Sequence, residues 1–506
     1  MLAKVWSAAV CGVDGYLVTV ELDLGRGLPS YMTVGLPDSA VRESRERVVA
    51  AIRNSGYEFP CRRVTVNLAP AQFRKRGTQF DLPVALGILA ASGQIPAGDW
   101  VQRYCFLGEL ALDGGIQPVS GILPMAASAA SEGRQGVVLS RLNASEAALV
   151  GIQSLGAASL REVVGFIAGQ VRLESSAPSR PVVSVSAGDL ADVKGQGLGK
   201  RALEISAAGG HHLLLTGPPG VGKSMLAARL PGILPAPDDR ELLEIAKMAS
   251  VAGLSSCAAK AACPRPFRAP HHSLPPGALA GGGATCKPGE VSLAHGGVLF
   301  LDELPEFQRE SLEALRAPLE TRNAVVSRLG ERVIYPADFL LVAAMNPCPC
   351  GWKGHPKRHC TCSPGQESRY AARLSGPLLD RIDLGVELSS LNFRQWSETV
   401  EEEKSAKVRA RVETARARQA KRLAGEGLRL NAEMGPRQLR RHCPLAREAA
   451  AFMEAASERL HLSARSMDRV VKVSRTIADL ECSEAISGGH LAEALALSGR
   501  DRRMER

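Results

Sequence analysis

Hydrophobic and polar positions alternate in two short stretches near the start of the chain, residues 17–22 and 64–68. A period of two residues predicts half-buried β-strands. Residues 39–55 and 83–92 instead repeat their apolar side chains at helical spacing. This mixture predicts a first α/β unit over residues 1–170.

A second α/β unit is expected over residues 189–392, after a stretch (171–188) whose Ser and Pro content is typical of a linker. Residues 393–506 are strongly charged and follow helical spacing, which predicts a helical domain. Within it, residues 404–422 are predicted to form one long basic helix. A solvated helix face explains that charge more simply than a DNA-binding surface does.

The composition is that of a globular protein with several domains: 506 residues, of which 45% are hydrophobic and 23% charged. The net charge of +10 suits a polyanionic partner such as DNA, but it also suits an ordinary basic protein. Aromatic residues make up only 4%, so DNA contacts are expected to use phosphates rather than base stacking. The most apolar window, residues 82–91, is too short for a membrane span, and no convincing signal peptide precedes it. We therefore expect a cytoplasmic protein without a membrane partner.

The strongest motif lies in residues 211–230, where an apolar strand runs into G-x-x-x-x-G-K-S and then into an amphipathic helix. This is the context that a phosphate-binding P-loop requires. In such a loop, backbone N–H groups cradle the phosphates, Lys223 reaches the β- and γ-phosphates, and Ser224 holds Mg²⁺. The predicted nucleotide-binding residues are Gly217, Pro218, Pro219, Gly220, Val221, Gly222, Lys223 and Ser224.

Two further strand ends supply the polar groups that a P-loop needs for hydrolysis. An apolar run predicts a buried strand that ends at Asp302 and Glu303. Asp302 can complete the Mg²⁺ shell, and Glu303 can orient or deprotonate the attacking water. Another strand, within residues 338–347, ends in Asn346, whose side chain can contact the γ-phosphate or the lytic water.

This combination of strand ends resembles the AAA+ class of ATPases. DVKGQ (192–196) resembles the segment that covers adenine in that class. FRAPHHS (267–273), GEVSLAHGGVLFLDELPEF (289–307) and LSGPLLDRIDL (374–384) are similar to the magnesium-chelatase-like group. Together with GLPDSAVRESRERV (35–48), these segments resemble the ComM/YifB family. The resemblance extends over nearly the whole chain, and members of that family act as bacterial DNA motors.

The resemblance implies a P-loop AAA+ α/β core with a C-terminal helical lid, ATP and Mg²⁺ as cofactors, and assembly into a homohexameric ring. It implies DNA as the partner, single-stranded or branched, and helicase or branch-migration activity in the recombination of imported DNA. The alternative, taken from other chelatase-like proteins, is a motor that remodels protein complexes or helps to insert a metal. DNA-stimulated ATPase activity would separate the two.

The family pattern also implies roles for single arginines. Arg381, in LLDRIDL, matches the arginine finger that completes a neighbouring subunit's site. Arg465 matches sensor 2, which reaches the γ-phosphate from the lid, but Arg469 lies one helical turn away and leaves that assignment open. For His271 and His272, in the FRAPHHS segment, we expect only a structural role.

Residues 321–337 predict a strand–turn–strand hairpin with Leu-Gly at its tip. In related motors the hairpin at this place points into a central pore. Arg328 and Arg332 flank the turn and could grip DNA phosphates. An exposed hairpin that carries basic surface residues without binding DNA explains the pattern equally well.

The N-terminal unit resembles the α+β fold of Lon-type proteases over residues 77–89 and 108–124. In that fold these segments carry the catalytic Ser and Lys. Here Asp81 and Leu123 hold the two places, and neither can replace the nucleophile or the base. We therefore expect a Lon-protease-like domain that serves as a binding or assembly platform and cleaves no peptide.

Residues 346–362 contain two Cys-x-Cys pairs, formed by Cys348, Cys350, Cys360 and Cys362. A disulfide is not expected in the cytoplasm, whereas four thiolates can close a tetrahedral zinc shell. Cys-x-x-Cys is the commoner spacing, His355 or His359 could replace a thiolate, and unligated thiols are the alternative. The expectation is a small structural zinc loop that follows Asn346.

Overall fold

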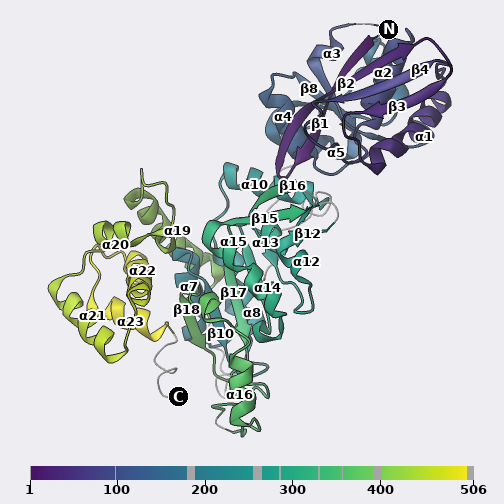
Figure 1. Cartoon of the computed structure of the whole chain (residues 1–506). Coiled ribbons are helices and arrows are strands. Elements are labelled where there is room, and N and C mark those ends of the chain that lie inside the picture. The colour runs from purple at the N-terminus through teal and green to yellow at the C-terminus, as the bar shows by residue number, and fades with distance from the viewer. Residues whose placement is uncertain are drawn as a thin grey trace. The chain divides into compact units, whose positions relative to one another are not determined.

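The computed structural model describes residues 2–96, 98–178, 188–254, 265–283, 286–328, 331–355, 357–390 and 402–498. The chain divides into two compact units (Figure 1). The first comprises Met1–Val182 and Asp239–Ala261, and the second comprises Val183–Asp238 and Ala262–Arg506. The first unit therefore includes a segment from the middle of the chain. Among the described residues, no helix is both long and apolar enough to cross a membrane.

The first unit is built on a mixed sheet. Its strands are β1 (Leu2–Cys11), β2 (Asp14–Gly25), β3 (Ser30–Val34), β4 (Arg63–Ala69), β5 (Tyr104–Phe106), β8 (Gly136–Ser140) and β9 (Gln153–Ala157). They lie in the order β3-β4-β2-β1-β5-β8-β9. β1, β2 and β4 pair antiparallel, whereas β5, β8 and β9 are parallel. A short hairpin, β6 (Glu109–Leu110) with β7 (Ile116–Gln117), stands apart from this sheet.

The helices of the first unit are α1 (Ser39–Asn54), α2 (Asp81–Ala91), α3 (Trp100–Arg103), α4 (Ile122–Ser131), α5 (Arg141–Ala147), α6 (Leu160–Ile167) and α10 (Asp239–Val251). The two strands and two helices expected from periodicity are confirmed as parts of β2, β4, α1 and α2. α1 begins where the Asp38 carboxylate accepts the Val41 N–H at 2.9 Å, which satisfies one of the unpaired N–H groups of a helix start.

α10 joins the first unit by capping a helix. Gly121, the residue before α4, has no side chain that could accept the first N–H groups of that helix. Ser250 of α10 does so instead: its Oγ accepts the Leu123 N–H at 3.1 Å, and its carbonyl accepts the Gly121 N–H at 2.8 Å. A segment that follows the P-loop in sequence therefore completes a helix of the N-terminal fold.

The second unit holds a five-stranded sheet in which every neighbouring pair is parallel. Its strands are β10 (Leu213–Thr216), β11 (Phe267–Arg268), β14 (Val298–Leu301), β17 (Leu340–Met345) and β18 (Leu384–Glu387), in the order β11-β14-β17-β10-β18. All four residues of β14 are buried, as a parallel strand covered on both faces requires. Because the strands are parallel, the carboxyl ends of β10, β14 and β17 meet at one edge of the sheet.

Helices surround this sheet and continue into the C-terminal part of the unit. They are α7 (Gly197–Gly209), α8 (Lys223–Ala227), α9 (Leu230–Ile233), α12 (Pro276–Ala280), α13 (Glu290–Leu293), α14 (Arg309–Ala314), α15 (Arg316–Thr321), α16 (Pro364–Ala371), α17 (Gly376–Leu379), α19 (Ser405–Arg422), α20 (Pro436–His442), α21 (Arg447–Arg459), α22 (Ala464–Leu480) and α23 (Gly488–Ala496). Two hairpins, β12 (Gly281–Gly282) with β13 (Lys287–Pro288) and β15 (Asn323–Arg328) with β16 (Glu331–Pro336), stand apart from the sheet.

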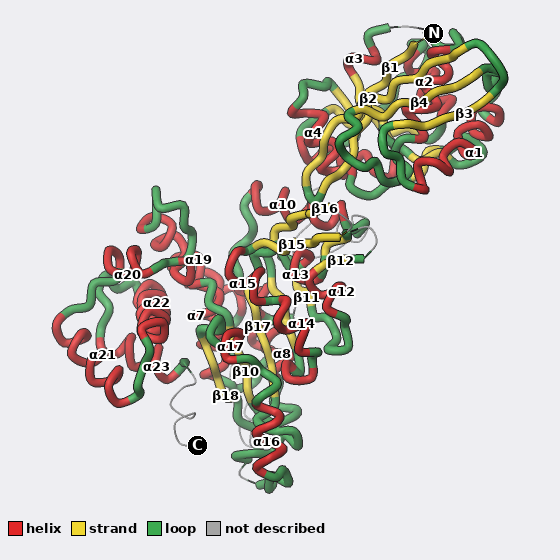
Figure 2. Tube along the Cα trace, in the orientation of Figure 1, coloured by secondary structure: helices red, strands yellow, loops and turns green. Residues whose placement is uncertain are grey.

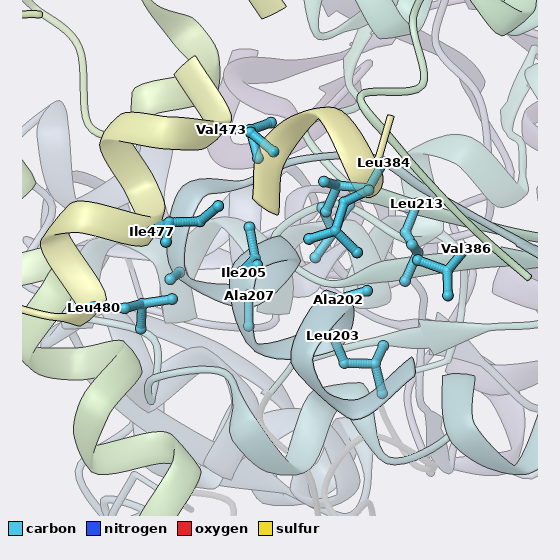
Figure 3. Packing of buried hydrophobic residues seen from close by; sticks show 14 of the residues in the cluster. Ala202, Leu203, Ile205, Ala207, Leu213, Leu384, Val386, Val473, Ile477 and Leu480 are labelled. Atoms are coloured by element: carbon cyan, nitrogen blue, oxygen red, sulfur yellow. The ribbon is translucent and has the colours of Figure 1, made fainter. Parts of the chain in front are cut away.

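The helical C-terminal part shares one hydrophobic core with the sheet. Figure 3 shows side chains of α7, β10, β18 and α22 packed together, among them Ile205, Leu213, Leu384 and Ile477. The basic helix α19 adds Val408, Val412 and Ala415 to the same core. Its charge is not simply a solvated face, because Arg411 pairs with the buried Glu204 and Arg416 donates to the Ala207 carbonyl. The structure confirms the expected α/β fold, with a helical C-terminal part packed on the parallel sheet.

Candidate nucleotide-binding site

The predicted P-loop runs from the end of β10 to the start of α8. Gly220 and Gly222 have φ angles of +79° and +92°, which L side chains rarely adopt. No heavy atom lies within 4 Å of a Cβ built at either position. Backbone geometry, not crowding, therefore explains why glycine stands at both positions.

Lys223 begins α8 and is buried, with 9% of the residue exposed. Its Nζ donates to the carbonyls of Gly217 and Pro218 at 2.7 and 2.9 Å, and to Asn346 Oδ1 at 2.9 Å. An ammonium group has three N–H donors, so these neutral acceptors occupy all of them. Burial lowers the pKa of Lys223, and the carboxylates of Asp302 and Glu303 oppose that shift. An anionic phosphate at this point would favour the charged amine.

Ser224 and Asp302 meet at the same edge of the sheet. Ser224 Oγ donates to Asp302 Oδ2 at 2.5 Å, and Asp302 Oδ1 accepts the Glu303 N–H at 2.9 Å. A hydroxyl and a carboxylate oxygen side by side are the ligand type that Mg²⁺ prefers. The structure therefore brings together Lys223, Ser224, Asp302 and Asn346, which come from three different strand ends.

Glu303 has an unusual backbone and a partner that the sequence did not suggest. Its φ of +52° is rare for a residue with a side chain. Its Oε2 lies 3.1 Å from Nδ1 of His272, and both side chains remain partly exposed. The contact depends on strand pairing, which the sequence does not reveal: His272 follows β11 closely, and β11 pairs in parallel with β14, the strand that leads to Glu303.

Arg381 and the two candidate sensor arginines lie near one another in the second unit. Arg381 bonds to the Glu320 carboxylate and to the Pro377 carbonyl, and its side chain is 9% exposed. Burial and then the positive charge of Arg465 lower the pKa of Arg381. Arg465 is exposed, whereas Arg469 is buried.

Family models match three parts of the chain: "Magnesium chelatase, subunit ChlI" over residues 189–396, "Subunit ChlI of Mg-chelatase" over 20–143 and "Magnesium chelatase, subunit ChlI C-terminal" over 402–498. YifB of Escherichia coli K12 is 45% identical over 504 residues, which cover 99% of this chain and 98% of YifB. The competence protein ComM of Haemophilus influenzae is 45% identical over 503 residues, which cover 98% and 97%. The chain belongs to the ComM/YifB family of magnesium-chelatase-like AAA+ proteins. A Mycobacterium tuberculosis protein is 43% identical over 481 residues, 95% of each chain.

In this ComM/YifB-family chain the hairpin expected at residues 321–337 consists of β15 and β16. Val325 pairs with Ile334 and Ser327 with Arg332, and these four residues form its exposed face. Leu329 and Gly330, at the tip, lie outside the described residues, as does the side chain of Arg328.

The two positions where a Lon-type protease would hold its catalytic pair are both buried in this family member, with 0% of each residue exposed. Asp81 accepts from Arg47 Nε at 2.7 Å and Nη2 at 3.2 Å, and from the Leu110 N–H at 3.3 Å. Burial raises the pKa of Asp81 to about 6, although Arg47 opposes the shift. The Leu123 N–H donates to Ser250 Oγ of α10 at 3.1 Å. Neither position presents a reactive group to solvent.

The cysteines of both Cys-x-Cys pairs converge in the second unit. One ligand atom from each of Cys348, Cys350, Cys360 and Cys362 lies within 4.8 Å of all the others. His355, the alternative ligand, uses Nδ1 to accept the N–H groups of Lys357 and Arg358 at 3.1 and 3.0 Å. The structure thus groups the four sulfurs without a histidine.

Proposed function

We propose that this protein hydrolyses ATP at its P-loop. The observation that carries the proposal is the convergence of two contacts, Lys223 with Asn346 and Ser224 with Asp302, at one edge of the sheet. Lys223 binds the β- and γ-phosphates, Ser224 and Asp302 hold Mg²⁺, Glu303 activates the attacking water and Asn346 contacts the γ-phosphate. Bound Mg²⁺ supplies charge neutralisation for the phosphates.

The present contacts of Lys223 must change before the nucleotide phosphates can bind. Its Nζ must leave neutral carbonyl and amide oxygens and turn to the anionic phosphate oxygens. The ammonium group is a charged donor in both states, but only the phosphate oxygens add the attraction between opposite charges. The exchange is therefore favourable, and it releases the Asn346 side chain to contact the nucleotide.

Two variants test these assignments separately. Lys223→Ala should weaken nucleotide binding, whereas Glu303→Gln should keep binding but lower the turnover number by roughly 10²- to 10⁴-fold. Binding of a fluorescent ATP analogue and steady-state phosphate release are the two measurements. Glu306→Gln is the control, because Glu306 lies three residues further along and pairs with Arg373. Normal turnover by the Lys223 or Glu303 variant would contradict the assignment.

We also propose that His272 positions Glu303. The contact between the two side chains is partly exposed, so its loss should cost at most about 1 kcal/mol, or a roughly fivefold fall in turnover number with KM unchanged. His271 is the matched control, because its Nδ1 contacts Ser273 instead of Glu303. In a Glu303→Gln background His272→Ala should have no further effect. An equal loss in that background would show that His272 acts in another way.

Assembly into a hexameric ring is part of the proposal, with Arg381 as the arginine finger. In the single chain Arg381 bonds to Glu320 of its own subunit. In a ring it would exchange this carboxylate for the γ-phosphate bound by the neighbouring subunit. Arg465, which is exposed, would reach the nucleotide from the lid as sensor 2.

We propose DNA as the substrate of the motor, and helicase or branch-migration activity in recombination of imported DNA as its task. The supports are the net charge of +10, the exposed Arg332 on the β15–β16 hairpin and the name of the relative ComM, a competence protein. The second candidate is a chelatase-like remodeller of protein complexes, which the magnesium chelatase family models favour. ATPase rates without DNA and with single strands, duplex and a four-way junction separate the two. Stimulation by DNA supports the first, and equal rates in all four samples would reject it.

A further inference from the structure

The four clustered cysteines have the geometry of a metal site. Cys348 Sγ lies 3.3 Å from Cys350 Sγ and 3.6 Å from Cys360 Sγ, and the last two sulfurs lie 3.6 Å apart. A disulfide would need about 2.05 Å. Four thiolates around one Zn²⁺, each at about 2.3 Å, would lie about 3.8 Å from one another. The sulfurs are therefore close to the separation that a tetrahedral zinc shell requires.

The surroundings of the sulfurs suit thiolates. The Cys350 N–H donates to Cys362 Sγ at 3.3 Å, and the Cys362 N–H donates to Cys360 Sγ at 3.4 Å. Such backbone donors orient metal-bound sulfur and stabilise its charge. When Zn²⁺ binds, the thiols release their protons to solvent, and the site is left with a net charge of roughly −2. Glu367 Oε1 lies 3.6 Å from Cys360 Sγ, and the ion pair of Glu367 with Lys353 offsets the negative charge of that carboxylate.

The same loop rests on the P-loop. Gly351 has a φ of +82°, and a Cβ built there would lie 2.6 Å from Cδ of Pro219. Lys353 forms an ion pair with Glu367 of α16, which lies among loops at one end of the second unit (Figure 2). The loop is thus anchored on α16 and touches the phosphate-binding loop through its glycine.

We propose that Cys348, Cys350, Cys360 and Cys362 bind one structural Zn²⁺, and that the zinc loop supports the P-loop through the contact of Gly351 with Pro219. A shell of four thiolates leaves no open position for water, so the metal takes no part in hydrolysis. It holds the chain between Asn346 and α16 in one conformation. The metal site is independent of the proposed ATPase activity, and only its effect on nucleotide binding rests on that activity.

Metal content tests the first part. Full-length protein purified without chelators should carry about one zinc per chain by elemental analysis, given a single four-thiolate shell. Co²⁺ in its place should show the intense visible bands of tetrahedral cobalt with thiolate charge transfer. Cys360→Ser with Cys362→Ser should lose the metal, whereas Cys61→Ser with Cys482→Ser, at two exposed cysteines, should retain it. Wild-type protein without zinc, with these four thiols freely reactive or joined as disulfides, would overturn the proposal whatever its ATPase activity.

Two glycine variants test the second part. Gly351→Ala and Gly354→Ala meet the same backbone penalty, because their φ angles are +82° and +74°, but no heavy atom lies within 4 Å of a Cβ at Gly354. Both variants should keep one zinc per chain. Gly351→Ala alone should weaken binding of Mg²⁺–ATP, by several-fold or more. Equal affinities of the two variants would show that the loop does not support the P-loop, while failure of wild-type protein to bind any nucleotide would instead reject the proposed ATPase.

Discussion

Replacing Arg465 and Arg469 one at a time should separate a catalytic arginine from a structural one on the same helix. Both lie on α22, one turn apart, but only Arg469 is buried. Arg469 Nη1 donates to the Ile382 carbonyl at 3.1 Å and Nη2 to the Asp380 carbonyl at 2.7 Å. These carbonyls flank Arg381, so Arg469 ties α22 to the segment of the proposed arginine finger.

The contacts set the expected magnitudes. A hydrogen bond that involves a charged group contributes about 1.5–3 kcal/mol, so Arg469→Met should destabilise the protein by about 3 kcal/mol or more. At about 2 °C per kcal/mol for a large domain, this corresponds to a fall in melting temperature of roughly 6 °C. Arg465→Met, at an exposed position, should change stability by no more than about 0.5 kcal/mol. If Arg465 stabilises the γ-phosphate in the transition state, the same change should lower the turnover number on the order of a hundredfold.

The assay combines thermal unfolding without nucleotide with steady-state ATPase rates. Nucleotide is left out of the unfolding samples because any ligand that binds the native state raises the melting temperature. Methionine replaces arginine in both variants, so the change in side-chain volume is the same at the two positions. An unchanged melting temperature for Arg469→Met together with lost hydrolysis would refute the reasoning and transfer the sensor role to Arg469.

Three further outcomes are expected. The Arg381→Ala variant should bind nucleotide but not hydrolyse it. Mixing it with the Glu303→Gln variant should restore some ATPase activity, because a mixed ring can contain a complete interface. No activity at any mixing ratio would argue against a site shared between subunits. The double variant Arg328→Ala with Arg332→Ala should weaken DNA binding. It should also lower the slope of log affinity against log salt by about 2, as the loss of two phosphate contacts requires. An unchanged slope would show that the hairpin does not contact DNA phosphates. The purified protein should cleave no casein with or without ATP. ATP-dependent cleavage that a change at Asp81 abolishes would contradict the expectation that the N-terminal unit has no protease activity.

The parts of the fold and of the candidate site that could be predicted are those encoded by contiguous sequence. The P-loop, the apolar strand before Asp302 and the alternating strands each depend on neighbouring residues, so their patterns are visible along the chain. Contacts between distant elements leave no such pattern. The pair of His272 with Glu303 depends on β11 lying beside β14, and the buried role of Arg469 depends on two carbonyls of another segment.

Helix α10 limits how the chain can be divided. The chain passes between the two compact units after residues 182, 238 and 261, so neither unit is a continuous module. A fragment that begins after residue 188 would keep α10 but lose α4, and the buried Met248 would be left without its partners. The N-terminal unit would lose Ser250, and with it the acceptor for the Leu123 N–H. The two units must therefore be expressed and folded together, and a truncated chain made without the first 188 residues should aggregate rather than report the activity of the proposed ATPase alone.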